Sequence, residues 1–203
     1  MQLYLVRHGQ TRWNVERRLQ GRTDSPLTLL GLRQVRAYAE RLREMLGDAE
    51  VELCASPLPR TRQTASLLVE ILELSSERYS ESELLAERYC GDWEGQKLDE
   101  LIEVHGEEVR AQWKRWDAVI GGDGETLAQV QSRARAWLDS KTARRPIVVV
   151  THGVMSRQFR GAYLQLDPEA TMALESHGQD RIYRLEDGAI TTLEVDPLAA
   201  EGI

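Results

Sequence analysis

A chain of 203 residues with 41% hydrophobic side chains is long enough to form one domain with a sizeable buried core. Its formal net charge of −7 argues against general binding to nucleic acids or anionic membranes, because those partners require a basic surface. The two cysteines, Cys54 and Cys90, are too few for a disulfide framework, and the sequence contains neither a secretory signal nor an apolar run of membrane-spanning length, so we expect a cytoplasmic protein.

The first half of the chain alternates short strand patterns with amphipathic helix patterns. Residues 3–6 form a short apolar run typical of a buried strand, and residues 10–26 are expected to form an ordered loop. A helix capped by Thr28 follows, with apolar side chains at three- and four-residue spacing. A second strand is predicted over residues 51–55, and a further helix begins at about Arg60. This alternation is typical of an α/β fold.

The second half begins with a weaker pattern. Residues 79–124 contain no clear strand, and we interpret them as a mostly helical insertion that borders the active site. Thr126 has the spacing of a capping box and begins another helix. The strongest strand signal is the β-branched run over residues 147–150. Near the end, Asp187-Gly188 separates two alternating segments and predicts a hairpin.

Strands that alternate with helices predict a largely parallel sheet covered on both faces. Ligands of such sheets bind beyond the carboxyl ends of the strands. His8 and His152 each follow directly after a predicted strand and precede a glycine. Because neighbouring strands lie about 4.8 Å apart, we expect the two imidazoles to face one another across a small ligand.

Arginines accompany both histidine segments and suit a phosphate ligand. Arg7 brings a permanent charge beside His8, while Asn14 adds an amide donor a few residues later. Arg60 stands at a helix start directly after a strand, where backbone N–H groups also favour an anion. Taken alone, Arg60 is more typical of an exposed arginine at a helix N-terminus, and Arg62 has the same ambiguity with no second argument in its favour.

A carboxylate is also needed if this site transfers a proton. Glu87, in the segment L-L-A-E-R-Y-C-G-D-W-E-G, is the candidate within the helical insertion. Its alternative interpretation is a surface carboxylate, which is common in a chain with 33 acidic residues. Glu94 in the same segment is a weaker competitor.

Six segments in this order resemble the histidine phosphatase superfamily, the phosphoglycerate-mutase-like group, over nearly the whole chain. They are R-H-G with T-x-W-N; L-Q-G-R-T-D-S-P-L-T-L-L-G-L-R-Q; S-P-L-x-R-T-x-Q-T-A; L-x-E-R-x-x-G-x-W-E-G; G-E-T before a helix; and T-H-G after a strand. The resemblance implies a three-layer α/β/α sandwich with a mostly parallel central sheet, formed by residues 1–203 as a single domain.

The resemblance also implies roles for individual residues. His8 would be the phosphorylated nucleophile, and Glu87 the general acid and base. The phosphoryl oxygens would be held by Arg7, Arg60 and His152. Further contacts with the substrate are expected from Asn14, Gln20, Gly21 and Gly153. Glu125, in the G-E-T segment, is expected to be mainly structural.

The predicted function is therefore hydrolysis of a small phosphorylated metabolite through a phosphohistidine. We expect His8 to be neutral for attack and His152 to be charged as a donor to the phosphoryl group. No metal or other cofactor is expected, because the arginines would repel a divalent cation and no zinc-ligand spacing is present. His105 and His177 lie outside every motif and are interpreted as surface or structural residues.

Two other functions remain open from the sequence. One is a mutase, which returns the phosphoryl group to its substrate. Residues 104–124 argue against a mutase, because this stretch is shorter than the basic insertion typical of such enzymes. The other is a phospho-ligand-binding module without catalysis, although every matched position is retained. The substrate and the oligomeric state, including a homodimer, also remain open. The segment 176–180 departs from the asparagine-containing pattern expected there.

Overall fold

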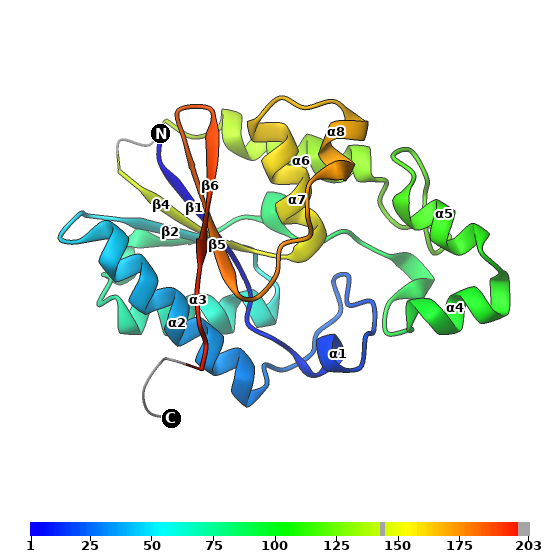
Figure 1. Cartoon of the computed structure of the whole chain (residues 1–203), viewed down its shortest axis with the longest axis horizontal. Helices are drawn as coiled ribbons and strands as arrows, with labels where there is room; N and C mark the ends of the chain where they lie inside the picture. Colours follow the sequence, from blue (N-terminus) through cyan, green and yellow to red (C-terminus); the bar gives the residue numbers. More distant parts are fainter. Residues whose placement is uncertain (143–144, 199–203) are drawn as a thin grey trace.

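The computed structural model describes residues 1–142 and 145–198, so the predicted domain limits of 1–203 extend beyond the described residues. Its strands form one six-stranded sheet in the order β3-β2-β4-β1-β5-β6 (Figure 1). In chain order these strands are β1 (Leu3–Arg7), β2 (Glu52–Ala55), β3 (Tyr79–Glu81), β4 (Ile147–Thr151), β5 (Arg181–Glu186) and β6 (Ala189–Glu194). The first four of the sheet order run parallel, and β5 pairs antiparallel with both β1 and β6.

Alternating side chains of the central strands build two separate cores. Tyr4 and Val6 of β1 pack in one cluster, while Leu3 and Leu5 pack in the other. The first face is covered by α2 (Leu29–Leu46) and α3 (Pro59–Ile71), and the second by α6 (Leu127–Asp139) and α7 (Gly153–Tyr163), as Figure 1 shows. The predicted three-layer α/β/α fold with a mostly parallel sheet is confirmed.

Several local predictions also agree with the structure. The Thr28 side chain accepts a hydrogen bond from the Gly31 N–H at the start of α2, and Thr126 forms a capping box at the start of α6. The β5–β6 hairpin turns at Asp187 and Gly188, whose φ values are 51° and 74°. These positive values explain why an Asp-Gly pair stands there.

Three elements differ from the sequence prediction. β3 lies within residues 79–124, where no strand is predicted; it is three residues long, pairs only with β2 and is largely exposed, so it lacks an alternating pattern. A short helix, α1 (Arg12–Val15), interrupts the predicted loop. The helix α8 (Pro168–Ala173) was missed, although Asp167 caps it and proline occupies its first turn.

The remaining helices, α4 (Leu98–His105) and α5 (Glu108–Lys114), lie at one end of the molecule, apart from the sheet (Figure 1). They pack around a third, smaller core with the short helix η3 (Gly91–Trp93). That core contains Cys90, Trp93, Leu101, Val109 and Ile120. Among the described residues, no helix has the length and apolar character needed to cross a membrane.

Candidate active site

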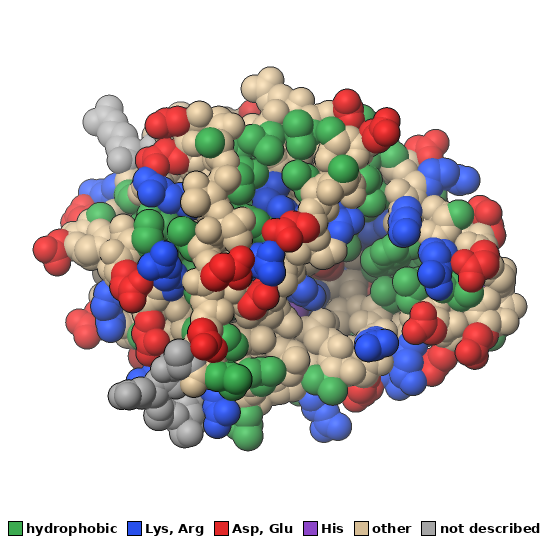
Figure 2. All heavy atoms as spheres, in the orientation of Figure 1, with side chains coloured by type: hydrophobic (Ala, Val, Ile, Leu, Met, Phe, Trp, Pro, Cys, Tyr) green, Lys and Arg blue, Asp and Glu red, His purple; other side chains and the backbone are tan. Residues whose placement is uncertain are grey.

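Pairing of β1 with β4 brings the two histidine segments together. Arg7 stands opposite Thr151 in this parallel pair, and the His8 N–H donates to the Thr151 carbonyl at 3.0 Å. The imidazole rings of His8 and His152 consequently lie 5.3 Å apart between centroids. A cavity of about 240 Å³ opens at this edge of the sheet. Figure 2 shows a hollow on the same face, with blue basic side chains at its rim.

All but one of the predicted site residues line this cavity. Those that line it are Arg7, His8, Asn14, Gln20, Gly21, Arg60, Glu87 and Gly153. Arg7 and His8 lie at the end of β1, Asn14 lies in α1, and Gln20 and Gly21 lie in the loop after it. Arg60 lies in the first turn of α3, Glu87 follows η2 (Glu83–Leu85), and Gly153 begins α7. The exception is His152, which is fully buried and is not among the lining residues.

The hydrogen bonds of His8 define its tautomer. Its Nδ1 lies 2.8 Å from the Gly9 carbonyl oxygen, which can only accept, so Nδ1 carries the proton. Its Nε2 accepts a hydrogen bond from Arg60 Nε at 3.3 Å and therefore presents a lone pair. Burial and the charges of Arg60 and Arg7 hold the pKa of His8 well below its ordinary value. The ring is neutral, with its lone pair on Nε2.

Arg60 is held by the loop that follows α1. Its two terminal nitrogens donate to the Thr23 carbonyl at 2.8 Å and to the Gly21 carbonyl at 2.7 Å. Only 1% of the residue is exposed, and burial lowers the pKa of Arg60 to about 10, so it remains charged at neutral pH. The guanidinium is thus fixed beside Nε2 of His8 with further N–H groups available.

Arg7 approaches the cavity from the end of β1. It donates one hydrogen bond, from Nη1 to the His177 carbonyl at 2.7 Å, which leaves most of its N–H groups for a ligand. A Cβ at position 153 would lie 3.4 Å from Arg7 Cζ, an ordinary van der Waals distance, so Gly153 lies directly beside the guanidinium. Asn14 uses its amide oxygen to accept from Thr11 N and from Gln179 Nε2, which leaves the amide NH₂ for the cavity.

The carboxylate of Glu87 sits at the N-terminus of α7. Its oxygens accept hydrogen bonds from the backbone N–H groups of Val154 at 3.1 Å and Met155 at 2.9 Å, and from its neighbour Arg88 at 2.9 Å. These donors and the helix dipole stabilise a negative charge there. The carboxylate therefore has a fixed position on the cavity wall.

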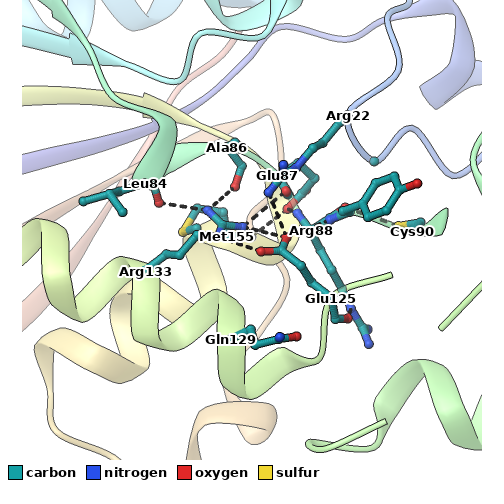
Figure 3. A network of polar contacts seen from close by, with 12 residues as sticks. Arg22, Leu84, Ala86, Glu87, Arg88, Cys90, Glu125, Gln129, Arg133 and Met155 are labelled. Atoms are coloured by element: carbon teal, nitrogen blue, oxygen red, sulfur yellow. Dashed lines mark hydrogen bonds and ion pairs between the residues drawn. The ribbon is translucent and has the colours of Figure 1, made fainter. Parts of the chain in front are cut away.

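A buried polar network holds the chain on which Glu87 stands (Figure 3). Arg133 of α6 donates to the carbonyl oxygens of Leu84, Ala86 and Glu87. The same guanidinium pairs with both carboxylate oxygens of Glu125, at 2.8 and 2.9 Å. Burial works to raise the pKa of Glu125, but the hydrogen bonds from Arg133 and from the Tyr89 N–H, together with the charges of Arg133 and Arg22, outweigh it and hold the pKa below its usual value.

Glu94, the weaker candidate for proton transfer, does not line the cavity. Its carboxylate accepts from the backbone N–H groups of Arg22 and Thr23 and from the Thr23 hydroxyl. It thereby ties the loop that carries Gln20 and Gly21 to the helical segment. The φ of Gly21 is 51°, and a Cβ there would stand only 1.9 Å from a Glu94 oxygen.

The surroundings of His152 do not favour the positive charge that the sequence analysis expects for it. Its Nε2 is 2.7 Å from the Ser56 hydroxyl, and Nδ1 has no hydrogen-bond partner within the described residues. Burial first, then the charges of Arg60 and Arg7, lowers the pKa of His152 well below its ordinary value. In the ligand-free site the ring is therefore neutral. A buried imidazolium beside the charged Arg7 and Arg60 would be strongly unfavourable in free energy.

Sequence reasoning missed the contribution of residues 175–180. Gln179 Nε2 donates to the His8 carbonyl at 3.0 Å and to Asn14 at 3.2 Å. His177 is fully buried. Its Nδ1 lies 2.7 Å from the Ser156 hydroxyl, and its carbonyl oxygen accepts a hydrogen bond from Arg7. The departure from the family pattern at 176–180 was the only signal, and it does not reveal these contacts.

Some of the other residues of interest lie outside the site, whereas two of them line the cavity. Arg62 is exposed and pairs with Glu81, and His105 is exposed at the end of α4. Of the tryptophans, Trp113 lines the cavity, whereas Trp93 belongs to the third core. Cys90 lines the cavity, but burial raises the pKa of its thiol to about 12, so it is not a thiolate. Among the described residues, no group of three or more His, Cys, Asp or Glu side chains could hold a metal ion.

Because three buried histidines have lowered pKa values, we expect the folded protein to lose stability in acid. The pKa of His177 is lowered by burial to about 3, and those of His8 and His152 also lie well below 6.5. The unfolded chain therefore binds more protons than the folded one below pH 6.5, and stability is lost as the pH falls. We expect the free energy of unfolding to drop by up to about 1.4 kcal/mol per pH unit for each of them.

Denaturant unfolding between pH 6.5 and 5 measures this slope, because the carboxylates titrate mainly below that window. His177→Gln should reduce the slope by about one proton relative to the wild-type chain. Constant stability across the window, or an unchanged slope in the variant, would contradict the prediction.

Comparison with known proteins gives a consistent result. The family model described as histidine phosphatase superfamily (branch 1) matches residues 3–189. A protein of Photorhabdus laumondii named probable phosphoglycerate mutase GpmB is 33% identical over 181 residues, which cover 86% of this chain and 80% of that protein.

Solved structures are also similar. A mycobacterial glucosyl-3-phosphoglycerate phosphatase in complex with VO3 has a TM-score of 0.81 and 28% identity, with 96% of each chain covered. A Bacillus stearothermophilus protein, YhfR, has a TM-score of 0.76 and 28% identity, with 95% of each chain covered.

Proposed function

Because this chain belongs to the histidine phosphatase superfamily, we propose that it hydrolyses small phosphate monoesters through a phosphohistidine on His8 Nε2. The observation that carries the proposal is the tautomer of His8, whose Nε2 lone pair points at the Arg60 guanidinium in a cavity also lined by Arg7. A nucleophile without a proton beside two permanent positive charges suits a tetrahedral dianion.

Substrate binding places the phosphoryl group between the two arginines. Their guanidiniums and the Asn14 amide donate to its oxygens, which neutralises the charge that opposes attack. His8 Nε2 then forms a bond to phosphorus as the bond from phosphorus to the ester oxygen breaks. The proton stays on Nδ1 throughout. Its hydrogen bond to the Gly9 carbonyl oxygen stabilises the positive charge that develops on the ring.

Glu87 carries the proton in both steps. In the first step the carboxyl group of Glu87 gives a proton to the leaving alkoxide and becomes a carboxylate. Water then attacks phosphohistidine, Glu87 takes a proton from it, and inorganic phosphate and neutral His8 are released. The backbone donors of α7 hold the carboxylate oxygens in one place between these steps.

The proposal requires no metal, because Arg7 and Arg60 supply the positive charge that a metal would otherwise bring. His152 supports His8 from the buried side through its ring contact. A cavity of about 240 Å³ suits a small metabolite rather than a protein segment. We propose that residues 1–203 act as a single domain and that the helical segment within 79–124 borders the substrate; Trp113 and Glu87 support this.

A mutase is the second candidate, and the relatives named probable phosphoglycerate mutase favour it. It would use the same phosphohistidine but return the phosphoryl group to a substrate hydroxyl instead of to water. The mycobacterial relative named as a phosphatase, which aligns over 96% of both chains, favours hydrolysis.

The two candidates differ in their products. We expect inorganic phosphate to be released from at least one member of a panel of phosphorylated metabolites, with no isomerised ester formed. Colorimetric detection of phosphate and chromatography of phosphoglycerate isomers on the same reaction provide the measurement. Isomerisation that exceeds phosphate release would favour the mutase, and neither product from any member of the panel would refute both.

A further inference from the structure

Gln179 lies just before β5 and contacts residues of the site without lining the cavity itself. Because β5 runs antiparallel to β1, the residues that follow β1 lie beside those that precede β5. Gln179 is consequently within hydrogen-bond distance of the His8 carbonyl oxygen and of the Asn14 side chain. It belongs to the segment 176–180, which departs from the family pattern, so the family resemblance assigns it no role.

Hydrogen bonds to the main chain determine which way the Gln179 amide faces. A carbonyl oxygen can only accept, so the Gln179 atom that lies 3.0 Å from the His8 carbonyl oxygen is the nitrogen of its NH₂ group. The second hydrogen of this group is donated to Asn14 Oδ1 at 3.2 Å. Both donors of the amide therefore act on groups of the site.

The oxygen of the Asn14 amide is identified by its partners in the same way. The Thr11 backbone N–H can only donate, and it lies 3.0 Å from Asn14 Oδ1. The Thr11 hydroxyl donates to the same oxygen at 3.1 Å, and Gln179 is the third donor. Among the described residues, none accepts a hydrogen bond from the Asn14 NH₂ group. Since Asn14 lines the cavity beside Arg7 and Arg60, its NH₂ group is left for a ligand.

The orientation of the Asn14 amide decides whether the side chain attracts or repels a phosphoryl group. Rotation of the amide by 180° exchanges its oxygen and its NH₂ group with little change of shape. In the observed orientation the NH₂ group donates to a phosphoryl oxygen. In the opposite orientation the amide oxygen would face that oxygen, and two acceptors repel one another. Thr11 and Gln179 favour the first orientation because both donate to Oδ1.

We infer that Gln179 is a positioning residue that holds the Asn14 amide with its NH₂ group towards the phosphoryl oxygens of the substrate. This rests on the proposed function, in which the same amide donates to the phosphoryl group. Because Gln179 does not line the cavity, it acts on the ligand through Asn14. The loss of phosphate affinity caused by Asn14→Ala should therefore depend on the residue at position 179.

Calorimetric binding of inorganic phosphate measures this loss. In the wild-type chain, Asn14→Ala should weaken binding about tenfold, since it removes a hydrogen bond to a charged ligand. In the Gln179→Glu background a carboxylate replaces the NH₂ group that faces Asn14. A charge-assisted hydrogen bond is about twice as strong as the neutral one from Thr11, so the amide should rotate and turn its oxygen into the cavity. Asn14→Ala should then cost no phosphate affinity.

Each comparison is made between two chains with the same residue at position 179, so the direct repulsion of phosphate by an added carboxylate cancels. Gln63→Glu is the matched control, because it adds the same charge at an exposed position of α3 outside the cavity lining. Asn14→Ala should still cost about tenfold in that background. A tenfold loss that persists in the Gln179→Glu background would overturn the inference, as would no phosphate binding or no loss in the wild-type chain.

Gln179→Met takes the place of Gln179→Glu if the latter does not fold. It removes the donor without adding a charge, so the loss caused by Asn14→Ala should shrink to less than about threefold, and an undiminished loss would again overturn the inference. Phosphate release from p-nitrophenyl phosphate by the wild-type chain is measured separately. Release without the expected pattern of affinity losses rejects this inference alone, whereas the pattern without release rejects the hydrolytic function alone.

Discussion

Replacing His8 with alanine is expected to reduce phosphate release by at least about four orders of magnitude. The variant removes the Nε2 lone pair, and no second nucleophile occupies the same place: His152 is neutral but does not line the cavity. Arg7 and Arg60 remain, because their hydrogen bonds to His177, Thr23 and Gly21 do not depend on the imidazole. The loss should therefore lie in kcat rather than in the binding of phosphate.

Steady-state phosphate release and calorimetric binding of inorganic phosphate together measure this outcome. His105→Ala serves as the matched control, since His105 is exposed at the end of α4 and does not line the cavity. Trapping a phosphorylated protein by rapid acid-free quenching should succeed in the wild-type chain and fail in His8→Ala. Near-normal turnover by His8→Ala would refute the phosphohistidine mechanism.

Replacing Glu87 with glutamine is expected to have the second-largest effect, and its size should depend on the leaving group. An alkoxide needs a proton as it departs, whereas nitrophenolate departs without one. General acid catalysis contributes about 10²- to 10⁴-fold, so kcat/KM for glycerol phosphate should fall by that factor. The value for p-nitrophenyl phosphate should fall far less.

The structure explains why the test compares the losses of kcat/KM on the two substrates and does not rely on the loss on either substrate alone. A glutamine at position 87 can still accept from Met155 and Arg88, but its NH₂ would meet the Val154 N–H, and this contact shifts the side chain. Such a shift would slow both substrates alike. Glu103→Gln on the exposed side of α4 is the matched control. Equal losses on the two substrates would remove Glu87 from the role of proton donor.

Part of the site could be read from short segments because it depends on local chemistry. Arg7 ends a strand and His8 follows it directly, and the helix-start position of Arg60 is visible in the chain order. The backbone carbonyl that holds His8 Nδ1 belongs to the next residue, Gly9, so the tautomer is also a local property. The caps at Thr28 and Thr126 act within one helical turn and were likewise predicted.

Contacts between distant segments could not be predicted in the same way. Nothing in the segment around Glu87 indicates that its carboxylate meets the first turn of α7, because 67 residues separate it from Val154. The hydrogen bond from Gln179 to the His8 carbonyl spans 171 residues. Each such contact depends on the packing of whole elements, which local propensity does not encode.

The charge of His152 illustrates the same limit. Its position after a strand was correct, but the sequence carries no information about desolvation, and full burial beside Arg60 and Arg7 lowers the pKa of His152 well below its ordinary value. β3 is a further case: its three residues form a strand because β2 offers an open edge, not because their own pattern demands one.

The sequence by itself determined the strand and helix alternation, the α/β class, the family, and most of the residues that line the cavity, because periodicity, capping and motif order are properties of neighbouring residues. The tertiary structure decided which arginines keep free N–H groups, which histidine meets the cavity, and where Glu87 is held. These depend on burial and on hydrogen bonds between segments far apart in the chain, and both arise only when the sheet brings the ends of β1 and β4 together.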